Sequence, residues 1–229
     1  MTRPLALSAA LVGAHTLAHL TLPARWWQGP HVASNLAVAV AVALSDRSAL
    51  FGVGRWPRQL AVSVAAAVGG GLLTSWAMGK PGLHRVYAAE RVTSLPPGRR
   101  SVHLAVMVPL GTVLPEEVLF RGVLQRQWEE KTGRWWGGVL GSALAFGLWH
   151  TGPSIAALRR LEEPPARLAA AAAKTVAATA LAGVGFGALR VLSGGLAAPI
   201  GAHLGINLVG SAAGGETCHL NRAETAGDE

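Results

Sequence analysis

Seven apolar segments, separated by polar or basic stretches, constrain this chain more than any other feature of its sequence. A run of about 20 apolar residues is long enough to cross a bilayer as a helix, and a spanning helix satisfies its own backbone hydrogen bonds. We therefore expect an all-α, polytopic transmembrane bundle of about seven spans, with six to eight possible because the second segment is short. The segments are Leu5–Leu22, Val32–Leu44, Gln59–Met78, Ser101–Leu124, Gly137–Thr151, Leu168–Leu192 and Leu196–Ala213.

The composition agrees with a membrane location. Hydrophobic residues make up 51% of the chain and charged residues 14%, against about 25% charged residues in an ordinary soluble domain. The net charge of +8 would suggest nucleic acid in a soluble protein, but here Lys and Arg lie mostly between apolar segments, where they suit lipid headgroups. We expect a multi-pass integral protein of the cell membrane, in contact with the lipid bilayer and with no nucleic acid partner.

The chain divides into three regions along its length. Residues 1–100 hold the first three apolar segments and a basic loop, Lys80 to Arg100. Residues 101–213 carry polar groups inside apolar segments and are expected to form a catalytic transmembrane core, followed by a polar tail at 214–229. The single cysteine, Cys218, excludes an intrachain disulfide and lies outside the apolar segments, which disfavours a thiol nucleophile.

Three ionisable residues, Glu116, Glu117 and Arg121, lie within the apolar segment Ser101–Leu124. Charges inside a bilayer are costly and usually face a protein interior or a water-filled cavity, with partners. On a helix, Glu117 and Arg121 are four apart and predict an ion pair. Glu116 points about 100° away, without a cation on its own face, which makes it the candidate for general acid and base chemistry. A purely structural ion network of all three residues is an equally good interpretation of this segment alone.

Two prolines, Pro109 and Pro115, lie in the same segment. Proline lacks the backbone N–H that continues a helix. We therefore expect a kink or a locally unwound stretch immediately before the two glutamates.

Two further apolar segments each place polar groups on one face. His150 follows Phe146 by four residues, and His203 precedes Asn207 by four. If these faces converge on Glu116, the carboxylate and His150 could together take a proton from water. His203 and Asn207 could then donate hydrogen bonds to the oxyanion of an attacked amide. Such a cluster suffices for peptide hydrolysis without a cofactor.

Other interpretations of these residues stay open. Glu and two His are plausible zinc ligands, but the chain has no His-Glu-x-x-His spacing and a zinc enzyme would still need a separate base. Serine catalysis fits worse, because no Gly-x-Ser-x-Gly elbow is present. His15 and His19, four apart in the first segment, could form a metal pair. We favour two polar groups satisfied between helices, because no carboxylate or cysteine is near them in sequence.

The three motifs Glu116-Glu117-x-x-x-Arg121, Phe146-x-x-x-His150 and His203-x-x-x-Asn207, in that order, resemble those of the CPBP family. This family, also called Abi, includes the type II CAAX prenyl proteases and bacteriocin-immunity proteins, and the resemblance covers roughly residues 109–209.

The resemblance implies an intramembrane endopeptidase built as an all-helical membrane bundle, with its catalytic groups facing a cavity open to the membrane. It implies that Glu116 and His150 activate water, that His203 and Asn207 form the oxyanion hole, and that Glu117 and Arg121 support the site. It implies a peptide or membrane-protein substrate and a metal-free reaction, although zinc is the alternative. A non-catalytic immunity, scaffold or transport protein is the competing function.

Overall fold

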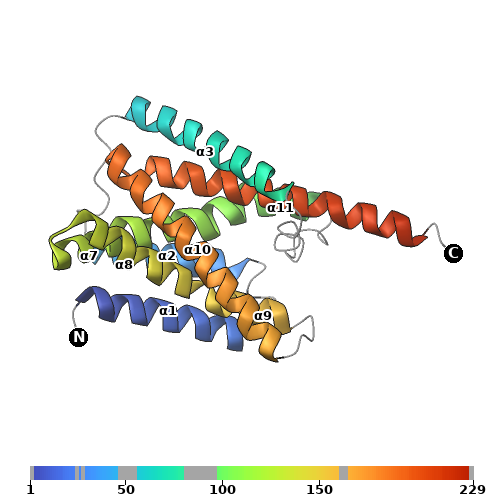
Figure 1. The fold of residues 1–229 in the computed structure, drawn as a ribbon, viewed down its shortest axis with the longest axis horizontal. Coiled ribbons are helices and arrows are strands. Elements are labelled where there is room, and N and C mark those ends of the chain that lie inside the picture. The colour runs from blue at the N-terminus through green and yellow to red at the C-terminus, as the bar shows by residue number, and fades with distance from the viewer. Residues whose placement is uncertain are drawn as a thin grey trace.

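The structure is a computed structural model that describes residues 3–23, 26, 29–45, 56–79, 97–159 and 165–226. Each of the seven expected apolar segments lies largely in a helix, and the described residues contain no strand (Figure 1). The basic loop falls outside the described residues as far as residue 96. The helices are α1 (Arg3–Thr21), α2 (Pro30–Ser45), α3 (Trp56–Met78), a composite helix (Pro97–Thr132), α8 (Trp135–Trp149), α9 (Thr151–Arg159), α10 (Pro165–Ser193) and α11 (Ala197–Ala226).

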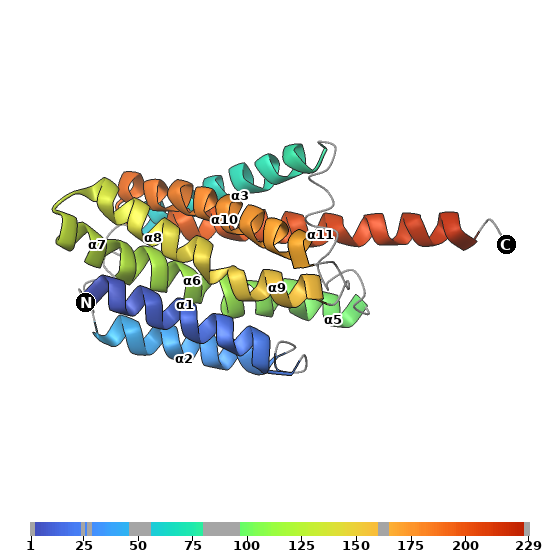
Figure 2. The same ribbon diagram turned by 60° about the horizontal axis from the view of Figure 1, so that its bottom comes forward.

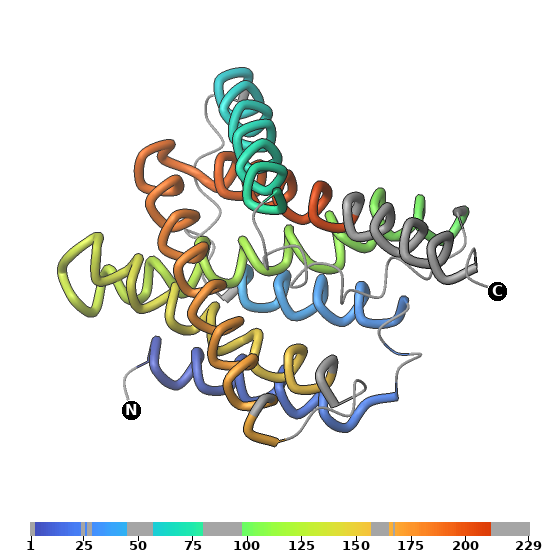
Figure 3. Tube along the Cα trace, turned by 45° about the vertical axis from the view of Figure 1, so that its right-hand side comes forward, coloured from blue at the N-terminus to red at the C-terminus, as the bar shows by residue number. Residues whose placement is uncertain are grey.

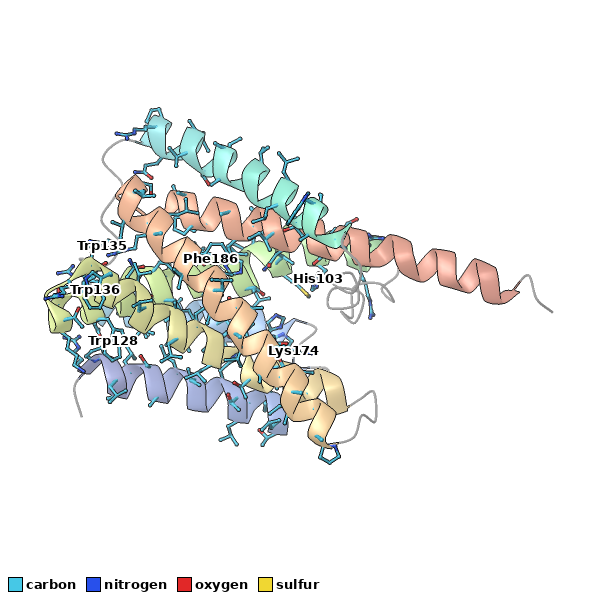
Figure 4. The ribbon with its side chains drawn as sticks, in the orientation of Figure 1. His103, Trp128, Trp135, Trp136, Lys174 and Phe186 are labelled. Atoms are coloured by element: carbon cyan, nitrogen blue, oxygen red, sulfur yellow. The ribbon has the colours of Figure 1, made fainter. Side chains whose placement is uncertain are left out.

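Within the described residues, four helices are long and apolar enough to cross a membrane: Arg3–Thr21, Pro57–Met78, Gly98–Thr132 and Leu168–Ser193, with Pro30–Leu44 a shorter apolar helix. The all-helical architecture is therefore confirmed, whereas the count of seven spans is not. Trp128, Trp135 and Trp136 gather at one end of the bundle, where α7 turns into α8 (Figure 4). Tryptophans at such an end are typical of the membrane–water interface.

The composite helix is continuous but changes its winding along its length. It consists of α5 (Pro97–Val102), the π-helix η5 (His103–Val113), α6 (Leu114–Glu116), the π-helix η6 (Glu117–Leu124) and α7 (Gln125–Thr132). The wide turns are visible at Leu114, whose N–H donates to the Pro109 carbonyl, and at Gln125, whose N–H donates to the Phe120 carbonyl. The unwinding expected from the prolines thus takes the form of π turns, which occur often at functional sites.

The backbone carbonyl of Gly111, near Pro115, receives a hydrogen bond from another helix. In an α-helix the Gly111 carbonyl would accept from residue 115, but proline has no N–H to donate. Instead, the Asn35 amide of α2 donates to the Gly111 oxygen at 2.7 Å. The helices come this close because Gly111 has no side chain: a Cβ there would lie 2.8 Å from a Val32 methyl carbon. Helix α2 therefore supports the backbone about one turn before Glu116.

The composite helix has α1 and α2 on one side and α11 on the other, with α3 packed on α11 (Figures 2 and 3). The α3–α11 contact is between backbones. A Cβ at Gly201 or Gly205 would collide with the carbonyl groups of Ser63 and Ala67. Small residues allow this approach between membrane helices. His203 lies between the two glycines in sequence. The close packing of α3 on α11 therefore fixes how near α11, and with it His203, comes to the rest of the bundle.

Two sharp turns use glycine in the left-handed region, Gly133 (φ 66°) between α7 and α8 and Gly194 (φ 69°) between α10 and α11. A residue with a Cβ is strained in this conformation. After the second turn, α11 continues past Ala213 to Ala226. The backbone of the expected polar tail is therefore helical through residue 226.

Candidate active site

The centre of the site is a fully buried ion pair on the composite helix. An Arg121 guanidinium nitrogen, Nη1, lies 3.1 Å from Glu117 Oε1, and both side chains are 0% exposed. The pairing predicted from their spacing is confirmed. Aromatic rings cover the guanidinium, with its Cζ 4.1 Å from the centroid of Phe146 and 5.0 Å from that of Phe186. Figure 4 shows Phe186 in the middle of α10, where that helix crosses the bundle. Ring faces stabilise the cation in place of water.

His203 lies between the two adjacent carboxylates. Its Nδ1 donates to Glu117 Oε1 at 2.7 Å, and its Nε2 lies 3.9 Å from Glu116 Oε2. A carboxylate only accepts, so the short contact places a proton on Nδ1. The imidazole also stacks on Phe186, with 4.8 Å between centroids. Helix α11 is therefore held to the composite helix through this ring.

Glu116 has different neighbours from Glu117. Its Oε1 accepts a hydrogen bond from the indole Nε1–H of Trp149 at 3.0 Å. Its Oε2 is buried and makes no hydrogen bond within the described part of the chain, and the same holds for Oε2 of Glu117. Glu117 thus contacts a guanidinium and an imidazole, whereas Glu116 is held at one oxygen by a neutral donor.

His150 lies at the C-terminal end of α8, and a backbone carbonyl orients its ring. Nδ1 is 2.8 Å from the carbonyl oxygen of Phe146. Because a carbonyl only accepts, Nδ1 carries the proton and Nε2 of the neutral ring is an acceptor. The half-buried ring is within electrostatic range of Glu116, His203 and Arg121. Phe146 therefore serves two residues, because its carbonyl holds His150 and its ring covers Arg121.

Asn207 stands apart from this network. It lies one turn after His203 in α11 and is half-buried. Among the described residues, no hydrogen bond of its side chain is found. The structure thus brings Glu116, Glu117, Arg121, His150 and His203 together, and Asn207 makes no hydrogen bond to them within the described residues.

Sequence reasoning missed Trp149 and the role of His15. The His15 imidazole of α1 stacks on the Trp149 ring with centroids 3.5 Å apart and planes 8° from parallel, and it meets His19 edge-on at 4.5 Å. His15 lies between helices, as expected, but its ring covers a ring that binds Glu116. One signal was available: a buried indole N–H needs an acceptor, and Trp149 adjoins a candidate catalytic histidine.

Most of the charged residues around Glu116 are enclosed by the protein. Glu116, Glu117, Arg121 and His203 are all buried. A pocket of about 280 Å³ lies elsewhere, beside the Arg190–Glu129 ion pair and the α10–α11 turn. Within the described ranges, no group of three or more His, Cys, Asp and Glu is positioned to hold a metal ion.

Comparison with protein families gives a match to the second half of the chain. A family model described as type II CAAX prenyl endopeptidase, Rce1-like, matches residues 98–209. No curated protein and no solved structure matches the chain. The matched range contains all seven residues of the three motifs, whereas α1, α2 and α3 lie before it.

Proposed function

Residues 98–209 belong to the Rce1-like family of type II CAAX prenyl endopeptidases, and from that premise we propose an intramembrane endopeptidase that hydrolyses a peptide bond with water activated by Glu116 and His150. The family is one of peptide hydrolases, and the helices are those of an integral membrane protein. The observation that carries the proposed mechanism is the unequal environment of the two glutamates. Glu117 is tied to Arg121 and His203, whereas the hydrogen bond to Glu116 comes from the neutral indole of Trp149.

In the first step, Glu116 and His150 act on the attacking water. His150 holds its Nδ1 proton against the Phe146 carbonyl, so its Nε2 is the basic nitrogen. The two groups accept the proton of the water as its oxygen bonds to the scissile carbonyl carbon. The same proton then passes to the leaving amine as the C–N bond breaks, which returns the site to its starting state.

His203 and Asn207 are the proposed donors to the oxyanion. His203 already donates from Nδ1 to Glu117, so a second donation from Nε2 requires the imidazolium form. In that form the charges of Glu116, Glu117, Arg121 and His203 cancel. Asn207 would add an amide N–H from the next turn of α11. Donors fixed before the reaction stabilise developing charge without reorganisation.

The proposed reaction uses no metal or cofactor. A zinc protease is the alternative, with Glu116, His150 and His203 as candidate ligands. Stoichiometric zinc in the purified protein, together with chelator-sensitive activity that zinc restores, would replace the proposal. A non-catalytic immunity, scaffold or transport protein is the other alternative, in which the polar cluster serves packing or proton movement.

We propose a peptide or a membrane protein in the cell membrane as the substrate. The description of the matching family points to a prenylated C-terminal Cys-a-a-X sequence as the first peptide to test. His150 and Asn207 are half-buried, whereas Glu116 and His203 are buried, so we propose that the scissile bond approaches past these two residues.

The test compares wild type with Glu116→Gln in lipid nanodiscs. The probes are a fluorogenic farnesylated Cys-a-a-X peptide and its unprenylated twin. Glutamine keeps the size of the side chain and an oxygen for the Trp149 N–H, so the melting temperature should not change. Cleavage should fall about 100-fold or more, as for loss of a general base.

Cleavage by Glu116→Gln at the wild-type rate would exclude the proposed mechanism. If wild type cleaves neither probe, peptides released from native membranes are compared between wild type and Glu116→Gln. Identical peptides from both would favour the non-catalytic alternative.

A further inference from the structure

The Trp149 indole is held on more than one side, which makes it a rigid donor. It is 6% exposed, and its Nε1–H points at Glu116 Oε1 over 3.0 Å. Phe120 meets it edge-on, with 5.4 Å between centroids and 78° between planes. One ring face is covered by His15 at 3.5 Å. A ring fixed by an edge contact and a stacked contact has little freedom to rotate its N–H away.

The N-terminal helix is seated closely enough to keep His15 in place. At the start of α9, a Cβ on Gly152 would lie 2.7 Å from Cα of Thr16 and 3.2 Å from Cβ of His19. The α1 backbone therefore contacts the chain just after His150 and presents His15 to Trp149. Three other histidines are near enough to act electrostatically on His15: His19, His31 and His150.

The contact matters because Glu116 has a competing partner. His203 Nε2 lies 3.9 Å from Glu116 Oε2, which is beyond hydrogen-bonding distance. In the imidazolium form proposed for His203, Nε2–H can donate, and a carboxylate free to rotate would close this gap and accept a bond from it. The hydrogen bond from the Trp149 N–H fixes Oε1, and this keeps the Glu116 carboxylate from rotating toward His203.

We propose that His15 and Trp149 form a positioning pair that keeps the Glu116 carboxylate apart from His203 and available to its substrate. Helix α1, which lies before the matched range, is thereby part of the machinery of the site. The effect on turnover rests on the proposed function, whereas the contact itself has a separate readout.

The kinetic experiment uses four variants in nanodiscs with the same prenylated peptide. Trp149→Phe keeps an aromatic ring under His15 but removes the N–H, and should lower kcat about 10- to 100-fold with KM within about twofold, as expected for a hydrogen bond to a charged group. His15→Ala should lower kcat about 2- to 10-fold, and His15→Phe should restore most of that loss by stacking. Leu17→Ala, on the exposed face of α1, is the control and should behave as wild type.

The structural experiment does not need a substrate. With ¹⁵N-labelled tryptophan, the chain gives indole N–H signals from its 8 Trp residues, and the Trp149 signal is the one missing in Trp149→Phe. This signal should move upfield in Glu116→Ala because its carboxylate acceptor is lost. It should also shift in His15→Ala and stay unmoved in Leu17→Ala.

The two readouts separate the possible failures. If Glu116→Gln cleaves normally while the indole signal shifts in both Glu116→Ala and His15→Ala, the proposed function is wrong but the contact between His15, Trp149 and Glu116 is confirmed. If Glu116→Gln is inactive but Trp149→Phe and His15→Ala turn over at the wild-type rate, the positioning pair is wrong. Should Trp149→Phe fail to fold, the comparison of His15→Ala with His15→Phe decides. If the indole signal shifts neither in Glu116→Ala nor in His15→Ala, the inference is wrong.

Discussion

The segment matched by the family and the three helices before it are joined to the site by different kinds of contact. Within 98–209, Glu116 and Glu117 contact a guanidinium and the imidazole of His203, and the neutral Trp149 indole also donates to Glu116. From α1, α2 and α3 come a stacked ring, an amide hydrogen bond and a backbone contact at glycines, none of them an ion pair. The charges define what the site can do, and the neutral contacts define where its parts lie.

The largest effect expected from this comparison is on the buried charges. Arg121→Ala leaves Glu117 buried without its guanidinium, which should cost about 3–5 kcal/mol of unfolding free energy. Glu130→Ala is the matched control, because Arg126 and Glu130 have the same spacing on the same helix at 2.8 Å but are 32% and 59% exposed. An exposed pair contributes about 0–1 kcal/mol. Unfolding is followed by thermal melting in detergent.

A normal melting temperature for Arg121→Ala, combined with lost activity, would contradict the structural role of the pair. Arg121 would then belong to the chemistry of the site. The division of the site into a reacting carboxylate, Glu116, and a supporting pair, Glu117 and Arg121, would then be wrong.

The next largest effect is expected where α3 meets α11. Gly201→Ala puts a methyl group into the Ser63 carbonyl and should cost about 1–3 kcal/mol, as overpacking does. Gly185→Ala is the same substitution on α10, where a Cβ meets nothing within 4 Å. It should be neutral or stabilise the helix by up to about 1 kcal/mol. Equal melting temperatures for the two variants would mean that the close contact between α3 and α11 does not fix the position of α11 in the bundle.

The smallest effect is expected at the contact between α2 and the composite helix. Asn35→Ala removes the donor to the Gly111 carbonyl and should destabilise by about 1 kcal/mol. Ser34→Ala is the control, because that hydroxyl bonds only within its own helix turn, to the His31 carbonyl at 2.9 Å. Chemical unfolding in mixed micelles can resolve the difference. If the two variants unfold alike, the carbonyl left without a donor by Pro115 is satisfied by another group.

The sequence predicts well what depends on neighbouring residues. Long apolar runs identify the helices, and a spacing of four identifies the Glu117–Arg121 pair. The prolines predict a disturbance before Glu116, but not its form. In an apolar environment the backbone keeps its hydrogen bonds, and wide turns preserve more of them than a break would. The π-helices follow from that constraint rather than from any residue preference.

Contacts between distant helices were beyond sequence reasoning. Trp149 and Glu116 are 33 residues apart, and no periodicity relates an indole on α8 to a carboxylate on the composite helix. The stack of His15 on Trp149 depends on how α1 is seated against α8 and α9. Periodicity placed His203 on a face of α11 but could not show that its nearer carboxylate is Glu117 and not Glu116.

The bond between His203 and Glu117 also bears on the order in which the protein is made. Its two residues are 86 positions apart, and a chain emerges from the ribosome N-terminus first. Arg121, four residues from Glu117, is present when that helix enters the membrane, so the carboxylate is compensated during insertion. His203 comes only with the last helix. A chain stalled before α11 would hold Glu117 and Arg121 without His203 and would leave uncovered the face of α3 on which α11 packs. Membrane quality control could recognise such an intermediate as unfinished.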